Sequence, residues 1–222
     1  MKTAILFGAT GFVGSFLLEE LLQSSSYARV IAVSRRPLKV EHHKLTVLIG
    51  DLSNLASLKM ELRADDVFIT IGTTRAKTPD EKEYYAIDHD YPVEAARSLK
   101  ENGAHSVFLL TAVGADTESS LFYLRLKGEV ERDIRALHYD HTAIFRPSMI
   151  MGARDESRPA ERAFQRLWPV IDRLLAGSLA KYRGIEGRDI ARAMVAAAAG
   201  YTAADVKIFH WQEMRQLIEA QG

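Results

Sequence analysis

The sequence predicts an α/β fold with a doubly wound parallel sheet and a small lobe toward the C-terminus. Three observations support this prediction. Short apolar runs alternate with segments of helical periodicity, the runs are apolar throughout, and a glycine-rich turn follows the first run. Alternating strands and helices are typical of right-handed βαβ units, and continuously apolar strands are typical of a parallel sheet covered on both faces.

Six apolar runs are predicted to be buried strands because each is short, rich in Val, Ile, Leu or Phe, and bounded by turn residues. In chain order these strands cover residues 4–7, 30–33, 45–49, 67–71, 107–110 and 142–145. Helices are predicted at residues 12–23, 55–61, 80–102, 119–137 and 188–199. A last strand at residues 206–209 and a closing helix at residues 212–220 complete the prediction.

Length and composition are those of one globular domain. The chain has 222 residues, of which 47% are hydrophobic and 26% charged. We expect residues 1–222 to form a single nucleotide-binding domain, with residues 147–186 as a small irregular lobe on its substrate side. The chain has no cysteine, which excludes disulfides, thiolate metal sites and a cysteine nucleophile. No metal site is predicted.

A glycine-rich loop lies directly between the first strand and the first helix. Its sequence is Gly8-Ala9-Thr10-Gly11-Phe12-Val13-Gly14. In this position the first glycine permits a tight turn, the second lets the backbone approach a pyrophosphate, and the third lets the helix pack close to the sheet. The pattern predicts a Rossmann-type dinucleotide site with the pyrophosphate at the helix N-terminus.

The end of the second strand indicates which dinucleotide is bound. A carboxylate at this position binds the ribose 2′-hydroxyl of NAD, but the sequence here is Ser34-Arg35-Arg36. Guanidinium groups bind phosphate bidentately. The sequence therefore predicts NADP(H) as the cofactor in preference to NAD(H), although arginines in a solvated loop are the alternative.

The third and fourth strands end at the same edge of the predicted sheet. Asp51 and Leu52 follow the third strand, and the acidic side chain could accept a hydrogen bond from the adenine amino group. Gly72, Thr73 and Thr74 follow the fourth strand, where a glycine turn would let the nicotinamide ribose lie against the backbone. We expect all five residues to contact the cofactor, since α/β sheets bind ligands at the carboxyl ends of their strands.

Tyr123 and Lys127 are the candidate catalytic pair. They are four residues apart on a predicted helix and therefore lie on one face of it. An ammonium near a phenol favours the phenolate, which would let tyrosine exchange a proton with a carbonyl or hydroxyl near neutral pH. The lysine could also bind the ribose hydroxyls, so both residues are predicted to contact the cofactor.

The chain resembles the short-chain dehydrogenase/reductases in their atypical branch, and more closely the Tat-interacting-protein-like oxidoreductases. The resemblance covers about residues 1–200 and is carried by residues 8–14, 72–75, 122–131, 145–147 and 156–159. It implies a Rossmann fold, an NADP(H) site and Tyr123 with Lys127 as the catalytic pair. It also implies that Pro147 and Ser148 close over the nicotinamide side.

The chain departs from the family pattern at one catalytic position. Family enzymes usually place a Ser or Thr just beyond the fifth strand, where it binds the substrate carbonyl. Thr111 is the only hydroxyl residue in the segment 110–115, and it is the candidate for this role. Ser119 or Ser120 are alternatives. Without such a donor, turnover would be lower by ~10²–10³-fold, judged from oxyanion-hole donors.

The predicted function is an NADP(H)-dependent oxidoreductase that transfers a hydride to or from a small carbonyl or alcohol. A dinucleotide-binding regulator that acts through a protein partner is the alternative, and an epimerase or dehydratase ranks third because the lobe is short.

Lys plus Arg equal Asp plus Glu at 29 each, so no nucleic-acid partner is expected. No apolar run is long enough for a membrane-spanning helix, and no signal peptide is recognised at the N-terminus. We therefore expect a cytoplasmic protein. We expect it to be a monomer or a homodimer.

Overall fold

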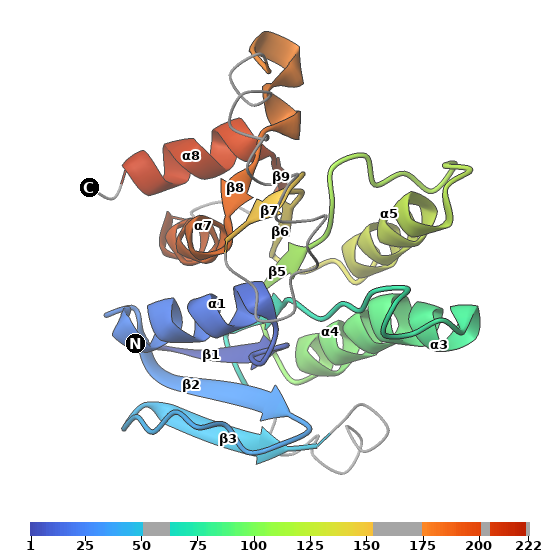
Figure 1. Cartoon of the computed structure of the whole chain (residues 1–222). Helices are drawn as coiled ribbons and strands as arrows, with labels where there is room; N and C mark the ends of the chain where they lie inside the picture. The colour runs from blue at the N-terminus through green and yellow to red at the C-terminus, as the bar shows by residue number, and fades with distance from the viewer. Residues whose placement is uncertain (51–62, 153–174, 201–204, 221–222) are drawn as a thin grey trace.

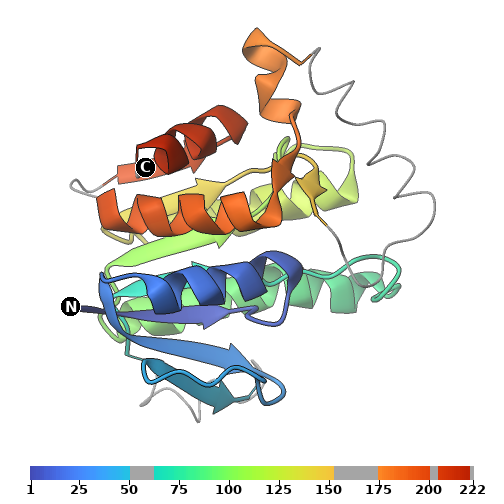
Figure 2. The same cartoon turned by 60° about the vertical axis from the view of Figure 1, so that its left-hand side comes forward.

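A seven-stranded parallel sheet forms the centre of the protein (Figures 1 and 2). The computed structural model describes residues 1–50, 63–152, 175–200 and 205–220. The strand order is β3-β2-β1-β4-β5-β6-β9, and every neighbouring pair is parallel. The strands are β1 (Lys2–Phe7), β2 (Tyr27–Ser34), β3 (Leu45–Ile49), β4 (Asp66–Ile69), β5 (Ser106–Leu110), β6 (His141–Phe145) and β9 (Asp205–Phe209).

This strand order confirms the predicted doubly wound α/β class. From β1 the chain proceeds outward to β2 and β3, and then returns to place β4 on the other side of β1. The order therefore reverses between β1 and β4, which is the position where open α/β sheets bind their ligands. All six strands predicted within residues 4–145 are present. Their ends lie within two residues of the predicted ones, except that β2 begins three residues earlier.

Helices cover both faces of the sheet (Figure 2). One face carries α1 (Phe12–Gln23), α7 (Gly187–Gly200) and α8 (Trp211–Glu219). The other face carries α4 (Tyr91–Glu101) and α5 (Phe122–Arg135), with α3 (Glu81–Tyr85) preceding α4. Because each face is covered, an inner strand of the sheet is apolar at successive positions rather than at alternate ones.

The inner strand β1 shows this double burial clearly. Ala4 and Leu6 belong to the core beneath α1 and α7, whereas Ile5 and Phe7 belong to the core beneath α4 and α5. All four side chains are almost completely buried. The continuous apolar run that predicted a parallel strand therefore has its physical cause in two separate hydrophobic cores.

The predicted helix at residues 80–102 is not regular. Its middle part, η2 (Ala86–Asp90), is a π-helix that joins α3 to α4. The amide of Tyr91 donates to the carbonyl of Ala86, five residues earlier, which is the hydrogen bond that defines a π-turn. The predicted helix is therefore present over residues 81–101 and ends at Asn102, but the sequence analysis did not predict its π-helical middle part.

The predicted lobe at residues 147–186 is described only at its two ends. These contain β7 (Ile150–Met151), η3 (Gly177–Tyr182) and β8 (Ile185–Glu186), and β7 pairs with β8 in a parallel two-stranded sheet. The rest of the lobe, like the predicted helix at residues 55–61, lies outside the described residues. The division into one domain with a small lobe therefore stays a prediction.

Candidate functional site

The glycine loop lies at the point where the strand order reverses. Gly8 follows β1 and has a φ of 96°. Residues that carry a Cβ atom rarely adopt a positive φ of this size. A Cβ atom on Gly14 would lie 2.0 Å from the carbonyl oxygen of Gly8, so only glycine lets α1 pack this closely against the turn. The amide of Gly11 donates to the same carbonyl at 2.9 Å. The loop therefore has the compact geometry that the sequence predicts.

The N-terminus of α1 has the features of an anion site. Gly11 is its N-cap, no side chain caps the helix there, and its first turn contains no acidic residue. The helix's own first turn therefore supplies no carboxylate to offset the positive end of the helix dipole. Thr10 and Gly11 are exposed at this end, while Phe12 and Val13 point into the protein.

The ring of Phe12 connects the glycine loop with the small β7/β8 sheet. A Cβ atom on Gly152 or on Gly187 would lie 2.7 Å from this ring, so both glycines are in close contact with it. The aromatic ring therefore packs where β7 and β8 end, and it joins the N-terminal loop to residues more than a hundred positions away.

The end of β2 presents two cationic side chains to solvent. Ser34 is buried, and its hydroxyl accepts a hydrogen bond from the amide of Arg36 at 3.4 Å. Arg35 and Arg36 are exposed, and in the described parts of the chain neither guanidinium has an ion-pair partner. Asp51 and Leu52, which were predicted to contact the adenine side, lie outside the described residues.

The turn after β4 is held by several polar contacts. The amide of Thr73 donates to Oδ2 of Asp88 at 2.7 Å, and its carbonyl accepts from the hydroxyl of Tyr84 at 3.3 Å. The Thr73 hydroxyl pairs with that of Thr78 at 2.9 Å. Gly72 is also close to Asp88, since a Cβ on this glycine would lie 3.5 Å from Oδ1. The segment Gly72-Thr73-Thr74 is therefore a fixed surface beside the sheet edge.

Tyr123 and Lys127 occupy one face of α5 but differ in environment. The tyrosine is 42% exposed, and no hydrogen bond to its hydroxyl occurs among the described residues. The lysine is buried, and its ammonium donates to Oδ1 of Asp88 at 2.8 Å. The ammonium lies 5.9 Å from the centre of the Tyr123 ring. The predicted pair is therefore assembled, with the lysine oriented and the phenol accessible.

Tyr84 is a member of this cluster that the sequence analysis did not identify. Its hydroxyl is buried between α3 and the turn after β4. Burial raises the pKa of Tyr84 well above its ordinary value, and the nearby Asp88 and Tyr123 raise the pKa further, whereas Arg75 lowers it. Its signal in the sequence was the four-residue spacing from Asp88, which places both on one helix face.

The hydroxyl of Thr111 is bound to a buried carboxylate. It donates to Oε1 of Glu131 at 2.6 Å, and Arg146 forms an ion pair with the same carboxylate. A threonine hydroxyl has one proton, so in this arrangement Thr111 does not donate to a substrate. Its role beside the substrate carbonyl stays a prediction that requires the hydroxyl to turn away from Glu131.

We expect Thr111→Val to lower the free energy of unfolding by about 1.5–3 kcal/mol, because it removes a hydrogen bond to a buried charged group. Urea denaturation followed by circular dichroism measures this effect. Thr117→Val is the matched control, since the Thr117 hydroxyl contacts the exposed Glu118 at 3.5 Å. A Thr111→Val protein as stable as this control would contradict the buried network.

The other predicted residues lie near the same edge. The hydroxyl of Ser119 accepts a hydrogen bond from the amide of Leu121 at 3.2 Å, and Ser120 is exposed. The buried Pro147 accepts from the amide of Val113 at 2.9 Å, which ties the segments after β5 and β6 together. Neither serine makes a contact that selects it as the substrate donor, so this assignment stays open.

Two surface clefts lie away from this edge. One, of about 330 Å³, is lined by Gly128, Glu131 and Arg146 together with residues 115–117. The other, of about 450 Å³, lies between α4 and α5 beside His89 and Asp133. Neither is lined by the glycine loop or by Tyr123, so neither coincides with the predicted cofactor site.

A parallel sheet with a glycine loop at its reversal point and a Tyr–Lys pair on a covering helix defines a dinucleotide-binding protein of the short-chain dehydrogenase/reductase type. The sequence profile of a family described as NAD(P)H-binding matches residues 8–205. The chain belongs to this NAD(P)H-binding family, and the resemblance to atypical short-chain dehydrogenase/reductases is confirmed.

Two curated relatives are close in sequence. "Protein fmp52, mitochondrial" of Aspergillus niger is 36% identical over 184 residues, which cover 80% of this chain and 79% of the relative. "Protein fmp52-1, mitochondrial" of Aspergillus terreus is 39% identical over 169 residues, which cover 73% of each chain.

Solved structures share the fold at lower sequence identity. WbmH of Bordetella bronchiseptica in complex with NAD+ has a TM-score of 0.69 and 19% identity, and the match covers 99% of this chain and 80% of that one. A UDP-N-acetylglucosamine 4-epimerase from Methanobrevibacter ruminantium has a TM-score of 0.69 and 18% identity, with 98% and 80% covered. At these identities the similarity establishes the Rossmann fold alone.

The predicted cytoplasmic location is wrong. Both relatives are named as mitochondrial proteins, and this finding overturns a prediction that depended only on missing targeting signals. A missing signal does not identify a compartment. Within the part of the chain that the structure describes, no helix combines the length and apolar character needed to cross a membrane.

Proposed function

We propose that the protein is an NADP(H)-dependent oxidoreductase that transfers a hydride between the nicotinamide and a small carbonyl or alcohol. The observation that carries this proposal is the assembled pair of an exposed Tyr123 and a buried, oriented Lys127 beside the turn after β4. Membership of the NAD(P)H-binding family supports the cofactor, and the relation to short-chain dehydrogenase/reductases supports the reaction type.

The residues present fit a dinucleotide along the carboxyl edge of the sheet. The glycine loop leaves backbone space at the uncapped end of α1, where the backbone amides of Thr10, Gly11, Phe12 and Val13 would surround the pyrophosphate. Gly72, Thr73 and Thr74 would line the nicotinamide ribose, and Pro147 with Ser148 would lie on the nicotinamide side. When bound, the cofactor supplies or accepts the hydride.

Side chains of the protein would transfer the proton that accompanies the hydride. The hydroxyl of Tyr123 would donate a proton to the substrate oxygen in reduction and accept one in oxidation. The ammonium of Lys127 has three N–H groups, of which one is donated to Asp88. The two remaining N–H groups are available for the ribose hydroxyls and would orient that sugar beside Tyr123.

Preference for NADP(H) would come from Arg35 and Arg36. Their exposed guanidinium groups follow β2, where no carboxylate is present to bind a ribose 2′-hydroxyl. We expect Arg35→Ala and Arg36→Ala each to weaken NADPH binding by roughly 10–100-fold, the effect of losing a charge-assisted hydrogen bond. NADH binding should change little, because NADH lacks the 2′-phosphate.

Fluorescence titration with NADPH and NADH tests both the site and the preference. Arg29→Ala is the matched control, since Arg29 also lies on β2 but bonds to Thr46. Equal affinity for the two cofactors, unchanged in Arg35→Ala, would overturn the preference. Failure of the parent protein to bind either cofactor would overturn the proposed function itself.

A second candidate function is a dinucleotide-binding regulator with little turnover. The observation in its favour is the Thr111 hydroxyl, whose proton is donated to Glu131 and is not presented to a substrate. NADPH binding without NADPH oxidation across a panel of aldehydes, ketones and quinones would favour the regulator. Oxidation with any member of that panel would favour the enzyme.

A further inference from the structure

We propose that the cleft of about 330 Å³ between α5 and residues 115–117 binds a small dianion, with Arg146 as the anchoring residue. We call it the α5 cleft. The ligand would carry a phosphate group or two carboxylates, since both present paired oxygens to guanidinium groups. This site is separate from the proposed cofactor site, because neither the glycine loop nor Tyr123 lines the α5 cleft.

Arg146 is held by a buried carboxylate on one edge of its guanidinium group. Nε donates to Oε1 of Glu131 at 2.9 Å, and Nη2 donates to Oε2 of the same residue. This carboxylate is 3% exposed and also accepts from Thr111 at 2.6 Å. In the parts of the chain that the structure describes, Nη1 has no hydrogen-bond partner. Glu131 therefore fixes the plane of the guanidinium and leaves its other edge for an anion in the cleft.

A fixed guanidinium is a favourable anion ligand. An arginine that is free in solvent loses side-chain entropy when it binds an anion, and this loss reduces the affinity. The Arg146 side chain is only 19% exposed and is already oriented by its ion pair. Most of the cost of ordering it was therefore met during folding.

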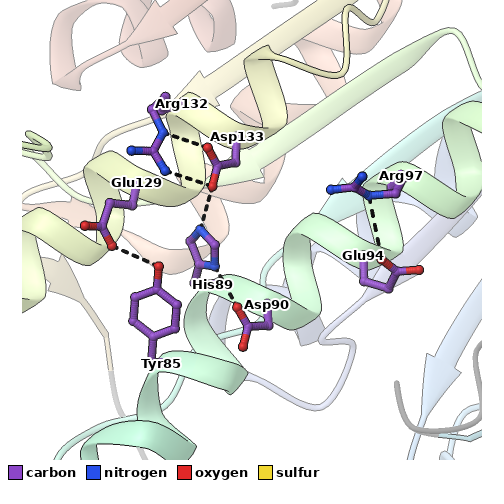
Figure 3. Close-up of polar contacts among 8 residues, drawn as sticks. All are labelled: Tyr85, His89, Asp90, Glu94, Arg97, Glu129, Arg132 and Asp133. Atoms are coloured by element: carbon purple, nitrogen blue, oxygen red, sulfur yellow. Dashed lines mark hydrogen bonds and ion pairs between the residues drawn. The ribbon is translucent and has the colours of Figure 1, made fainter.

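Two further arginines line the same cleft from α5. Arg132 and Arg135 are three residues apart, so they lie on one face of the helix. Figure 3 shows the donors of Arg132 directed at Asp133, with Nε 2.6 Å from Oδ1 and Nη2 3.0 Å from Oδ2. Arg135 is exposed and forms no ion pair with a described residue. We therefore infer that Arg135 is the second donor for the anion.

A glycine in α5 brings the other wall close to these arginines. A Cβ atom on Gly128 would lie 2.4 Å from the amide nitrogen of Thr117, so a larger residue would push the wall away from the helix. Asp116 also lines the cleft and is exposed, and its Oδ1 accepts from the amide of Glu118 at 3.0 Å. Its negative charge would repel an anion, which makes Asp116 a useful position for a test.

The second cleft, between α4 and α5, has the opposite character (Figure 3). Three carboxylates line it, those of Asp90, Glu94 and Asp133. Its arginine, Arg97, forms an ion pair with Glu94 at 3.7 Å. Excess negative charge disfavours an anion there, so Arg97 provides a matched control on a neighbouring helix.

Isothermal titration calorimetry with inorganic phosphate tests the α5 cleft in the full chain. Sodium chloride keeps the ionic strength constant, so that screening is the same at every point. We expect saturable binding with a Kd of about 1 mM, the affinity that a few charge-assisted hydrogen bonds supply after the cost of association. A parallel titration with malonate distinguishes a phosphate ligand from a dicarboxylate. Heats that do not saturate with either probe would overturn the inference.

Three exposed substitutions locate the binding. Arg135→Ala should weaken phosphate binding about tenfold, the effect of one charge-assisted hydrogen bond. Asp116→Asn should tighten it roughly threefold, because a repelling charge is lost while the amide oxygen still accepts from Glu118. Arg97→Ala should leave the affinity unchanged. Unchanged affinity in Arg135→Ala, or an equal loss in Arg97→Ala, would overturn the inference.

Arg146→Lys tests the anchor itself. Lysine retains a cation for Glu131 but lacks the second edge of N–H groups, so we expect phosphate affinity to fall at least about tenfold. Circular dichroism shows whether this variant is folded. Full affinity in the folded variant would exclude Arg146 as the anchor. If the variant does not fold, Arg135→Ala and Asp116→Asn still decide the question.

The glycine loop is the other place where phosphate would bind, so the titration is repeated with saturating NADPH. Phosphate in the α5 cleft should keep its affinity, because the two sites share no residue. Loss of phosphate binding on addition of NADPH would assign the ion to the glycine loop and overturn the inference. A protein that binds phosphate with the expected dependence on Arg135 but does not bind NADPH would refute the proposed function alone.

Discussion

A Tyr123→Phe protein is expected to bind NADPH like the parent protein and to lose about 10²–10⁴-fold in turnover, the usual contribution of a general acid or base. The hydroxyl is on a half-exposed ring and has no hydrogen-bond partner among the described residues. Its removal should therefore leave the fold intact while removing the proton donor. Turnover on any substrate found in the carbonyl panel, together with fluorescence titration of NADPH, provides the measurement.

Tyr85→Phe serves as the control for this variant. Its hydroxyl bonds to Glu129 between the helices, so its loss should affect stability slightly and leave turnover near that of the parent protein. Full turnover in Tyr123→Phe would exclude Tyr123 as the acid or base. A decrease of the same size in both variants would point to a general perturbation of α5.

Gly14→Ala is expected to destabilise the protein and to weaken NADPH binding together. The added Cβ would lie 2.0 Å from the carbonyl oxygen of Gly8 and 2.8 Å from the Thr70 hydroxyl, so α1 must move away from the turn. Overpacking of this kind lowers the free energy of unfolding by about 1–3 kcal/mol or more. A displacement near 1 Å at a binding site can weaken function by roughly 100-fold, and we expect NADPH binding to fall by about that factor.

Gly200→Ala is the matched substitution for Gly14→Ala. Gly200 also lies in a helix, and among the described residues no atom lies within 4 Å of the position that its Cβ would occupy. This variant should be as stable as the parent protein or more stable by up to about 1 kcal/mol, since alanine favours helices. Urea denaturation measures the stability of both variants, and fluorescence titration measures their affinity for NADPH. A Gly14→Ala protein that behaves like Gly200→Ala would contradict the close packing of the loop.

Most of the fold was predictable because its signals are local. Val67, Phe68 and Ile69 form part of a continuous apolar run, and such a run predicts a buried strand wherever it lies in space. The glycine loop was predictable for the same reason, since a positive φ at Gly8 is a requirement of the turn itself. The π-segment was missed although Pro92 indicated it, because a proline inside a helical pattern marks a disturbance but does not specify its form.

The candidate site was predictable only in part. Tyr123 and Lys127 are four residues apart, so helix geometry alone brings them to one face. Asp88 is 39 residues before Lys127, and Thr111 is 20 residues before Glu131. No local pattern connects members of such pairs. The donor for a substrate carbonyl was assigned to Thr111 from family resemblance, and the bond to Glu131 became visible only in the folded chain.

The sequence by itself determined the parallel sheet, the glycine turn and the helix that carries Tyr123, because each depends on neighbours along the chain and on which side chains avoid water. The tertiary structure alone decided which charges meet in the interior. Lys127 pairs with Asp88, 39 residues away, and Glu131 pairs with Arg146, 15 residues away, and the partners of each pair lie on different elements. A buried charge requires a partner, but the identity of that partner depends on packing that no sequence interval specifies.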